Sequence, residues 1–588
     1  GKRAFCNSKR SYYGGYGYVP RSESNELPLK IGWIEEEAFA GCKNLNLVTI
    51  PDSVTAIEEE AFSGCENLNL TNIPNSVTSI GKRVFAGCSN LHTIKLPSNM
   101  TAIGEEIFHN FIGLVSLEIP NSITSIGKQA FAGCKNLSSV TIPDSVTAIE
   151  EEAFNGCENL NLTSIPKSVA FIGRQAFGEC SSLTSVVIPS TITDIGKRAF
   201  CGSDRSYFRG YGCAYFPERR AVPLAVGTVE EEAFAGCSGL RSVTIPDSVR
   251  VIKEETFSGC ENLVSVKISI YTTSIGKKAF FKCKNLSSLS IPNSVTIIEE
   301  ETFSGCEKLA SVSIPTSVTS IGKRAFYGCS RLSSIAIPSS VISIESEAFS
   351  GCSYLTSITL SNSVRSISGI QLFDNSISSA GELPWSQCKR LNSIVVAQDN
   401  PYLASVDGIL FNKTMTRLLS YPQGKQGSYQ IPPRVQSIGD YAFYGCRQFT
   451  SIVVPLSSRS YERCQKYSDP GLQPLTMPDS VSSIGDHAFS GCTGLKTIAI
   501  SNSIRSIGER AFTRCHSLSR AYVPVGVNSL GESVFEDCRL LGVIFISKRS
   551  HFTESQLSRS ASIVLYPLER SGRSRYIRTA FGSVRLFY

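Results

Sequence analysis

The sequence predicts a repeat solenoid, a fold in which short coils stack on one another and share one continuous core. Three periodic features support this prediction. Cysteine recurs at intervals of 23 residues, an aromatic residue lies three positions before it, and proline usually lies nine positions after it. A fixed period of this length is the sequence signature of a repeat architecture. The regularly spaced cysteines are Cys42, Cys65, Cys88, Cys134, Cys157, Cys180, Cys237, Cys260, Cys283, Cys306, Cys329, Cys352, Cys492, Cys515 and Cys538.

The repeat from Leu137 to Leu160 shows how one coil is expected to form. Leu137, Val140 and Ile142 predict a short strand with one buried face, because buried and exposed residues alternate in a strand. Pro143 should end the strand, since proline has no N–H to donate to a neighbouring strand.

The second half of the same repeat is expected to close the coil. Val146 and Ile149 point inward, Ala153 and Phe154 fill the interior, and Cys157 takes a tight buried position. One such unit cannot bury its own apolar side chains. Neighbouring coils must therefore stack about 4.8 Å apart to create a core.

The repeat motif Ile-Pro-x-Ser-Val-x-x-Ile-x-x-x-Ala-Phe-x-Gly-Cys-x-x-Leu resembles the BspA-like leucine-rich repeat family. The motif is plainest in residues 142–160, 245–263 and 314–332, and the resemblance covers nearly all of the chain. It implies a leucine-rich-repeat solenoid, a right-handed coil with short parallel strands on one face and short turns or helical turns on the other. It also implies an extracellular or cell-surface protein that adheres to host or matrix proteins.

Interruptions of the 23-residue spacing divide the chain into four predicted parts. These are a leucine-rich-repeat solenoid at 1–365 with Tyr/Gly-rich loop insertions at about 7–30 and 202–227, an irregular repeat at 366–435, a second leucine-rich-repeat solenoid at 436–545, and a C-terminal cap or basic tail at 546–588. The family resemblance implies a β-hairpin insertion within 366–435. Because the chain begins at Gly1 inside a repeat, we expect it to be a fragment.

The two loop insertions are copies of one another, since residues 1–6 recur as residues 196–201. Aromatic and arginine side chains supply much of the binding energy at protein interfaces. The second insertion therefore provides the candidate partner-binding residues, which are Tyr207, Phe208, Arg209, Tyr211, Arg219 and Arg220. The alternative is a loop that is merely tolerated at the edge of a coil.

The regularly spaced cysteines are expected to be buried free thiols that pack as small apolar groups. No C-x-x-C spacing occurs, and side chains of stacked coils would point in parallel into the core. Cys201 and Cys213 flank the second insertion and form the candidate disulfide pair. The other cysteines expected to be open to oxidation are Cys6, Cys388 and Cys464.

Charged residues before each Ala-Phe pair alternate in sign from one repeat to the next. The sequence passes from 58–60, which is acidic, to 82–83, which is basic, and back to acidic at 105–106. Stacking places unlike charges side by side, and each exposed pair contributes about 0–1 kcal/mol. We expect this alternation to set the register of the coils and to keep the surface soluble.

The sequence predicts no catalytic, cofactor or metal site. The five histidines lie far apart, and no His-Glu-x-x-His motif, phosphate loop or dinucleotide fingerprint is present. A net charge of +7, with both signs interspersed, does not favour nucleic-acid binding. No run of about 18 apolar residues predicts a transmembrane segment.

The sequence favours a non-enzymatic binding protein, a surface or secreted adhesion module that contacts protein or glycan partners along the solenoid. Exposed strand positions carry mainly serine and threonine, which predicts a flat polar face. Trp33, just before Ile34, is expected to pack inside a coil. A structural spacer or assembly component and an intracellular protein-interaction scaffold, which would be cytoplasmic, remain alternatives. The identity of the partner and the oligomeric state stay open.

Overall fold

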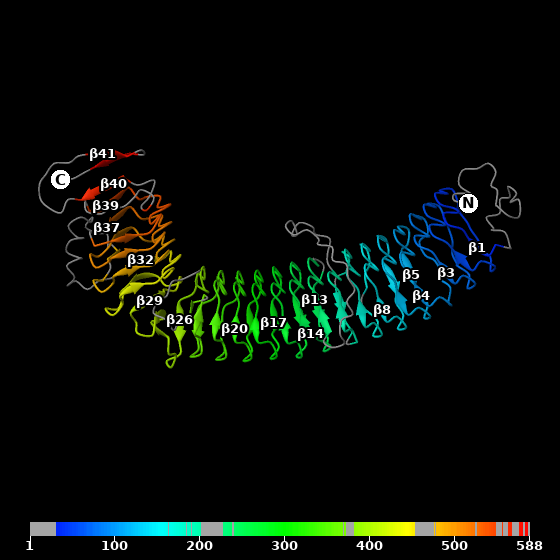
Figure 1. The fold of residues 1–588 in the computed structure, drawn as a ribbon, viewed down its shortest axis with the longest axis horizontal. Coiled ribbons are helices and arrows are strands. Elements are labelled where there is room, and N and C mark those ends of the chain that lie inside the picture. The colour runs from blue at the N-terminus through cyan, green and yellow to red at the C-terminus, as the bar shows by residue number, and fades with distance from the viewer. Residues whose placement is uncertain are drawn as a thin grey trace. The chain divides into compact units, whose positions relative to one another are not determined.

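The computed structural model describes residues 31–547 except 163, 184, 190, 201–226, 238–239, 369, 372–381, 453–474, 477 and 524–525, together with 556, 562–566, 576–579 and 582–585. The chain forms two compact units, residues 1–309 and 310–588. Each unit is a solenoid of stacked coils whose strands lie side by side (Figure 1). This confirms the predicted fold class.

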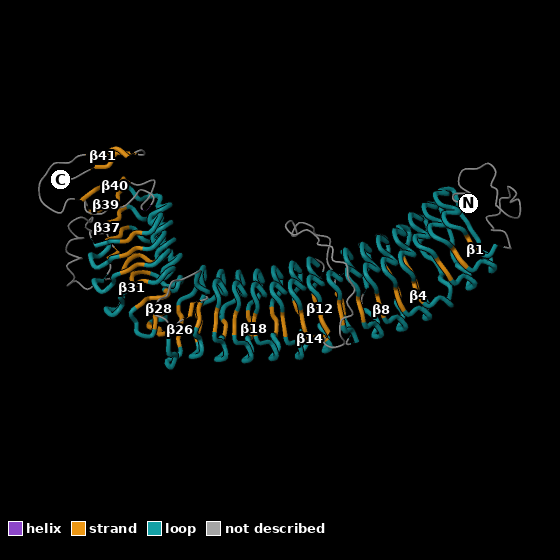
Figure 2. Tube along the Cα trace, in the orientation of Figure 1, coloured by secondary structure: helices purple, strands orange, loops and turns teal. Residues whose placement is uncertain are grey.

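In the first unit, each coil contributes strands to one or both of two rows, which Figure 2 draws in orange. The first row contains β5 (Ser116–Glu118), β7 (Ser139–Thr141), β10 (Ser185–Val187), β13 (Ser242–Thr244), β15 (Ser265–Lys267) and β17 (Ser288–Ser290). The second row contains β1 (Trp33–Ile34), β2 (Ala56–Ile57), β3 (Ser79–Ile80), β4 (Ala102–Ile103), β6 (Ser125–Ile126), β8 (Ala148–Ile149), β9 (Phe171–Ile172), β11 (Asp194–Ile195), β12 (Gly227–Val229), β14 (Val249–Ile252), β16 (Ser274–Ile275) and β18 (Ile297–Ile298).

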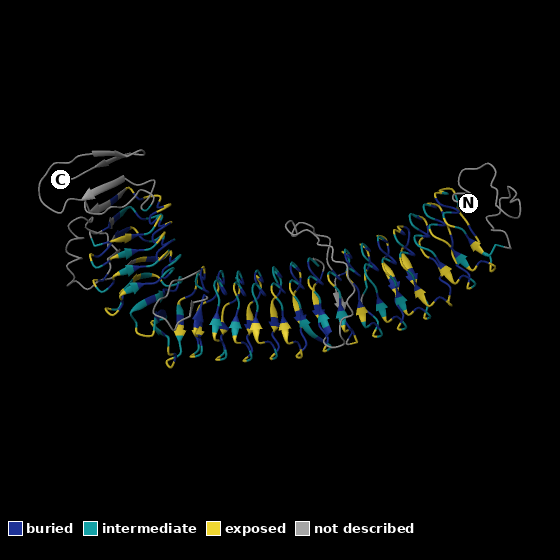
Figure 3. Ribbon diagram, in the orientation of Figure 1, coloured by how far each residue is buried: buried dark blue, intermediate teal, exposed yellow. Residues whose placement is uncertain are grey.

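Within both rows the strands are parallel, and residues one repeat apart are paired. Val140 pairs with Leu117 in the first row, and Ile149 pairs with Ile126 in the second. In β7 the middle residue is buried while its two neighbours are exposed, as the alternation predicts. Figure 3 shows buried and exposed stretches following one another along each coil.

The core is a continuous column of phenylalanine rings flanked by cysteines. The rings of Phe131 and Phe154 stack with centroids 4.9 Å apart and an interplanar angle of 6°. The Cys157 thiol donates to the Phe131 carbonyl of the preceding coil, with Sγ and O 3.2 Å apart. Phe111 replaces a cysteine in this column, is fully buried, and contacts the Phe85 ring at 5.6 Å.

The side of each coil that carries the Ala-Phe pair is built from turns. The residue before Ala-Phe has a positive φ in coil after coil, for example 55° at Glu152. The glycine before the cysteine also has a positive φ, 75° at Gly156, which suits glycine because it lacks a Cβ. These two left-handed residues turn the chain back within each coil.

The second unit repeats this arrangement and adds antiparallel strands. Its first row contains β19 (Ser311–Ser313), β21 (Ile335–Ala336), β23 (Ser357–Leu360), β26 (Ser393–Val396), β30 (Gly427–Tyr429), β32 (Phe449–Ile452), β33 (Leu475–Thr476), β35 (Thr497–Ala499), β37 (Arg520–Val523), β39 (Val543–Ser547) and β40 (Ser562–Tyr566). Its second row contains β20 (Ser320–Ile321), β22 (Ser343–Ile344), β24 (Ser366–Ile367), β29 (Arg417–Ser420), β31 (Ser437–Ile438), β34 (Ser483–Ile484), β36 (Ser506–Ile507) and β38 (Ser529–Leu530).

The antiparallel strands of the second unit lie outside this pattern. They are β25 (Ile370–Gln371), β27 (Leu403–Val406), β28 (Ile409–Asn412), β41 (Tyr576–Thr579) and β42 (Gly582–Arg585). β27 and β28 form a hairpin in which Val406 pairs with Ile409 across a turn at Asp407 and Gly408. β28 then pairs antiparallel with β29, and β29 pairs parallel with β31.

The structure corrects the prediction that Trp33 packs inside a coil. Trp33 precedes the buried Ile34 in β1, and successive residues of a strand point to opposite faces. Its side chain is therefore 60% exposed.

Two expectations about cysteines are also wrong. Cys42 is disulfide-bonded rather than free. It lies in the first described coil and is only half-buried, so its sulfur is less protected than those deeper in the stack. Cys388 is free and fully buried rather than open to oxidation, because its thiol continues the column and donates to the Phe349 carbonyl at 3.1 Å.

Candidate binding surfaces

The candidate residues of the second loop insertion lie outside the described residues. These are Tyr207, Phe208, Arg209, Tyr211, Arg219 and Arg220, together with the candidate disulfide pair Cys201 and Cys213. The coils on either side of this segment stack directly on one another. The Phe200 and Phe234 rings lie 4.6 Å apart and parallel, and Asp194 pairs with Thr228. The solenoid is thus continuous across the position of the insertion.

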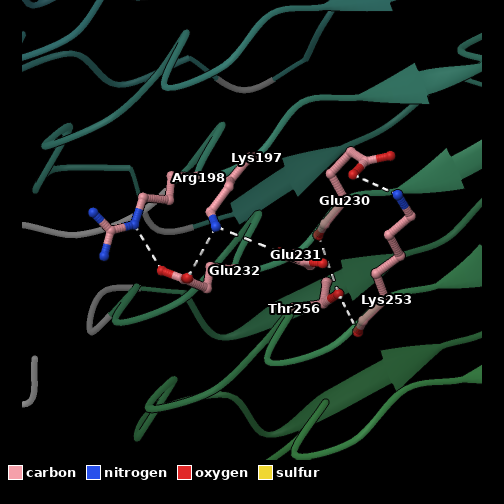
Figure 4. A network of polar contacts seen from close by, with 7 residues as sticks. All are labelled: Lys197, Arg198, Glu230, Glu231, Glu232, Lys253 and Thr256. Carbon is pink, nitrogen blue, oxygen red and sulfur yellow. Dashed lines mark hydrogen bonds and ion pairs between the residues drawn. The ribbon is translucent and has the colours of Figure 1, made fainter. Parts of the chain in front are cut away.

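A network of ion pairs joins the same two coils and the next one (Figure 4). The Arg198 Nε atom lies 2.7 Å from a Glu232 carboxylate oxygen, and Lys197 Nζ lies 3.4 Å from Glu231. Lys253 Nζ lies 2.7 Å from Glu230. The prediction that unlike charges lie side by side is therefore confirmed in these coils.

The same pairing recurs in other coils of the first unit. Arg83 Nε lies 2.7 Å from Glu106, and Lys128 Nζ lies 3.3 Å from Glu151. These side chains are partly exposed, so each pair contributes at most about 1 kcal/mol. The arrangement fits a role in the register of the coils.

The exposed face of the first strand row carries columns of short polar side chains. Ser242 pairs in register with Ser265, and Ser265 pairs with Ser288, all three being exposed. Thr244 and Lys267 form a parallel column on the same strands. We call Ser242, Ser265 and Ser288 the serine column. This regular polar surface is suited to an extended partner.

A pocket of about 480 Å³ lies in the second unit, at residues that the sequence analysis did not single out as a site. Its lining residues come from the turn side of four successive coils and from Glu382, and they are Glu382, Tyr441, Tyr444, His487, Ser490, Arg510, Thr513, Arg514, Glu536 and Asp537. The signal in the sequence is a change of residue type. Arg514 and Asp537 stand at the position directly before the cysteine, which is glycine in most other coils.

Aromatic rings form one wall of this pocket. The Tyr441 ring stacks on the His487 ring at 4.8 Å, and the Tyr444 ring meets Tyr441 edge-on at 5.5 Å. Burial raises the pKa of both tyrosines, and the nearby Glu382 carboxylate adds to the effect. Burial, with the Arg510 charge, lowers the pKa of His487, so its ring is neutral at pH 7.

The charged side chains of the pocket differ in their partners. Arg510 Nε lies 3.5 Å from Glu536, and Asp537 lies 3.3 Å from both His516 and Arg539. Arg514 has no ion-pair partner within 4.0 Å among the described residues.

Glu382 is the one lining residue with a buried polar atom that lacks a hydrogen-bond partner among the described residues. This atom is one of its carboxylate oxygens. Burial raises the pKa of this carboxyl, and Glu347 adds to the effect. The pocket therefore offers an exposed arginine without an ion pair and a carboxyl oxygen without a hydrogen-bond partner.

Comparison with known families identifies the repeat. The model of the BspA-type leucine-rich repeat region matches residues 16–117, 101–209, 219–294, 273–380, 320–416, 420–542 and 464–563. The chain belongs to the BspA-type leucine-rich repeat family. Proteins of this kind are generally protein-interaction or surface adhesion modules.

Several solved structures are similar to this BspA-type protein. A leucine-rich repeat protein from Bacteroides ovatus is 22% identical, with 85% of this chain and 92% of that chain covered and a TM-score of 0.39. A leucine-rich cell surface protein from Faecalibacterium prausnitzii is 24% identical over 72% and 84%, with a TM-score of 0.41. The pneumococcal vaccine antigen PcpA is 21% identical over 66% and 78%, with a TM-score of 0.42. The comparison with curated protein sequences gives no match.

The described residues of this BspA-type chain contain neither a metal-binding cluster nor a membrane-spanning helix. Within the described ranges, no three His, Cys, Asp or Glu side chains are grouped so that they could hold a metal ion. No helix in the same ranges has the length and apolar character needed to cross a membrane.

Proposed function

We propose that the chain is a non-enzymatic adhesion module that holds a protein or glycan partner along the exposed face of its first strand row. The serine column is the observation that supports this proposal. Its three side chains are exposed and held in register by the paired strands beneath them. A flat surface of this kind offers hydrogen-bonding groups at a regular spacing of about 4.8 Å, which an extended partner can follow.

The test replaces the three serines of the serine column with glutamine in the full chain. Glutamine is longer but neutral, so it obstructs the face without placing like charges beside one another. Binding to immobilised matrix proteins and glycans is then measured by surface plasmon resonance. We expect at least about a tenfold loss of affinity, which corresponds to about 1.4 kcal/mol.

The matched control replaces Ser79, Ala102 and Ser125 with glutamine. These residues occupy the outward positions of three successive strands in the second row. The control should bind as the unaltered chain does. Equal binding by both triple variants would refute the assignment of the partner to the first strand row.

We also propose that the protein works outside the cell, and the Cys42 disulfide supports this location. Disulfides persist mainly in oxidising compartments. Alkylation followed by mass spectrometry of the protein purified from its own cells tests the point. Cys42 should become modifiable only after reduction, whereas the buried free cysteines should react after unfolding alone. A Cys42 that reacts without reduction would favour the intracellular scaffold.

A further inference from the structure

We infer that the pocket of the second unit binds an acidic saccharide, a sugar that carries a carboxylate such as a hexuronate. This site lies on the turn side of the coils and does not depend on the strand-face function proposed above. The volume of about 480 Å³ falls in the range of small-ligand sites, which is about 300–1,000 Å³.

The composition of the lining selects a polar ligand. It contains tyrosine, histidine, serine, threonine, arginine and carboxylate side chains but no aliphatic side chain. An apolar ligand would leave these polar groups desolvated and without partners, which is unfavourable. A sugar has hydroxyls that can donate to Glu382 and Glu536 and apolar C–H faces that can pack on the rings of Tyr441 and Tyr444.

Arg514 provides the reason to expect a carboxylate on the sugar. Its guanidinium lines the pocket and has no ion-pair partner within 4.0 Å among the described residues, whereas Arg510 is already paired with Glu536 at 3.5 Å. The planar guanidinium can donate two parallel hydrogen bonds to a carboxylate, which adds both strength and specificity. The acidic group of the ligand is therefore placed at Arg514.

The backbone at this position allows a test of Arg514 that spares the fold. Arg514 occupies the column in which Gly445 and Gly491 stand, and all three have a positive φ, 58° at Arg514. Asp537 follows in the same column with a φ of 52°. Lys282 holds the same conformation at this position of a coil in the first unit, with a φ of 56°, so the backbone accepts both glycine and larger residues here.

The left-handed backbone provides a variant that separates binding from folding, because glycine adopts this conformation more readily than arginine. Arg514→Gly restores the residue type of the two preceding coils. The hydrogen-exchange protection of its coil should match or exceed that of the unaltered protein. The matched control is Lys282→Gly, which removes a lysine from the same column of the first unit, where φ is 56°.

The experiment titrates the full-length protein with methyl β-D-glucuronide and, separately, with the neutral methyl β-D-glucoside, using ligand-observed NMR and calorimetry. We expect the glucuronide to bind at least about tenfold more tightly than the glucoside. Arg514→Gly should weaken glucuronide binding about tenfold or more, and Lys282→Gly should leave it unchanged. Arg514→Lys should bind with intermediate affinity, since it keeps the charge but loses the paired hydrogen bonds.

Three results would overturn the inference. The first is equal affinity for the two sugars, and the second is unchanged glucuronide binding by Arg514→Gly. The third is tighter binding of an acidic peptide, N-acetyl-Glu-Glu-amide, than of the glucuronide, which would assign the pocket to a protein segment. None of these outcomes bears on the serine column, so the two proposals fail or stand separately.

Discussion

Substitution of Gly173 by alanine tests how closely the backbones of neighbouring coils approach. A Cβ atom at Gly173 would lie 2.5 Å from the carbonyl carbon of Glu150 and 2.5 Å from the backbone nitrogen of Glu151. Both atoms belong to the preceding coil, and neither can rotate away as a side chain could. The φ of Gly173 is not in the left-handed region, so backbone conformation alone would permit alanine.

Two opposing effects determine the size of the change. Overpacking of a closely packed interior costs about 1–3 kcal/mol. Alanine has less conformational freedom than glycine in the unfolded chain, and this difference stabilises the folded state by about 0.4–1 kcal/mol. The contact distances at Gly173 are below any normal separation, so we expect a net local destabilisation of about 1–2 kcal/mol. The hydrogen bond that the Gly173 N–H donates to the Ile149 carbonyl, with N and O 2.7 Å apart, should weaken first.

Gly104 provides the matched control because it occupies the same position of an earlier coil. The nearest atom to a Cβ there is the Ile107 Cδ1 at 3.3 Å, the end of a flexible side chain. Its φ also lies outside the left-handed region. Gly104→Ala should therefore be neutral or stabilise the coil by up to about 1 kcal/mol.

Hydrogen exchange with mass spectrometry is the suitable assay, because a long repeat protein does not unfold as a single cooperative unit. Peptides that cover residues 149–177 should exchange about 5- to 30-fold faster in Gly173→Ala, since 1.4 kcal/mol corresponds to a factor of ten. Peptides over residues 103–131 should be unchanged or better protected in Gly104→Ala. Equal protection from exchange in the two variants would show that the backbone of the preceding coil leaves room for a Cβ atom at Gly173, and it would refute the prediction.

Three further predictions concern the core, the ion pairs and the thiols. Phe154→Ala removes a fully buried ring from the stack and should cost about 3–5 kcal/mol, measured as local loss of hydrogen-exchange protection. Glu151→Lys replaces two attractions, to Lys128 at 3.3 Å and Arg174 at 3.7 Å, with repulsions. The hydrogen-exchange protection of the coils around residue 151 should fall and recover in 1 M salt, while partner binding is retained. Burial raises the pKa of Cys65 from 9.0 to about 12, so the folded state holds this proton more tightly than the unfolded state. The contribution of Cys65 to stability should be constant below about pH 8 and fall as the pH rises from about 9 toward 12, and Cys65→Ala should lessen the fall.

The sequence predicted the core well because every core position recurs at the same spacing. Phe131, Phe154 and Cys157 could each be placed inside a coil from the pattern alone, and their burial confirms it. The second strand row was harder to predict. A strand such as Ala148–Ile149 is two residues long, which is too short for alternation to be recognised in the sequence.

The pocket could not be predicted, because its residues are neighbours in the stack but not in the sequence. Tyr441 and His487 are 46 residues apart, twice the usual spacing, yet their coils are adjacent. The rings of Phe443 and Phe489, separated by the same 46 residues, stack at 4.7 Å. An interval of twice the usual length suggests that another coil lies between the two, so the sequence alone does not show that they are neighbours.

The pocket and the ion-pair network use the same column of the solenoid in two ways. In the first unit, the left-handed position before Ala-Phe holds charged residues such as Arg198 and Glu232, which pair across coils. In the second unit, the same position holds Tyr441, His487 and Arg510, with φ values of 55°, 52° and 50°. The backbone conformation is thus maintained, while the side chains at this position change from forming ion pairs alone to lining a pocket as well. A solenoid permits this exchange because its core depends on the phenylalanine and cysteine columns, and the turn-side column is therefore free to specialise.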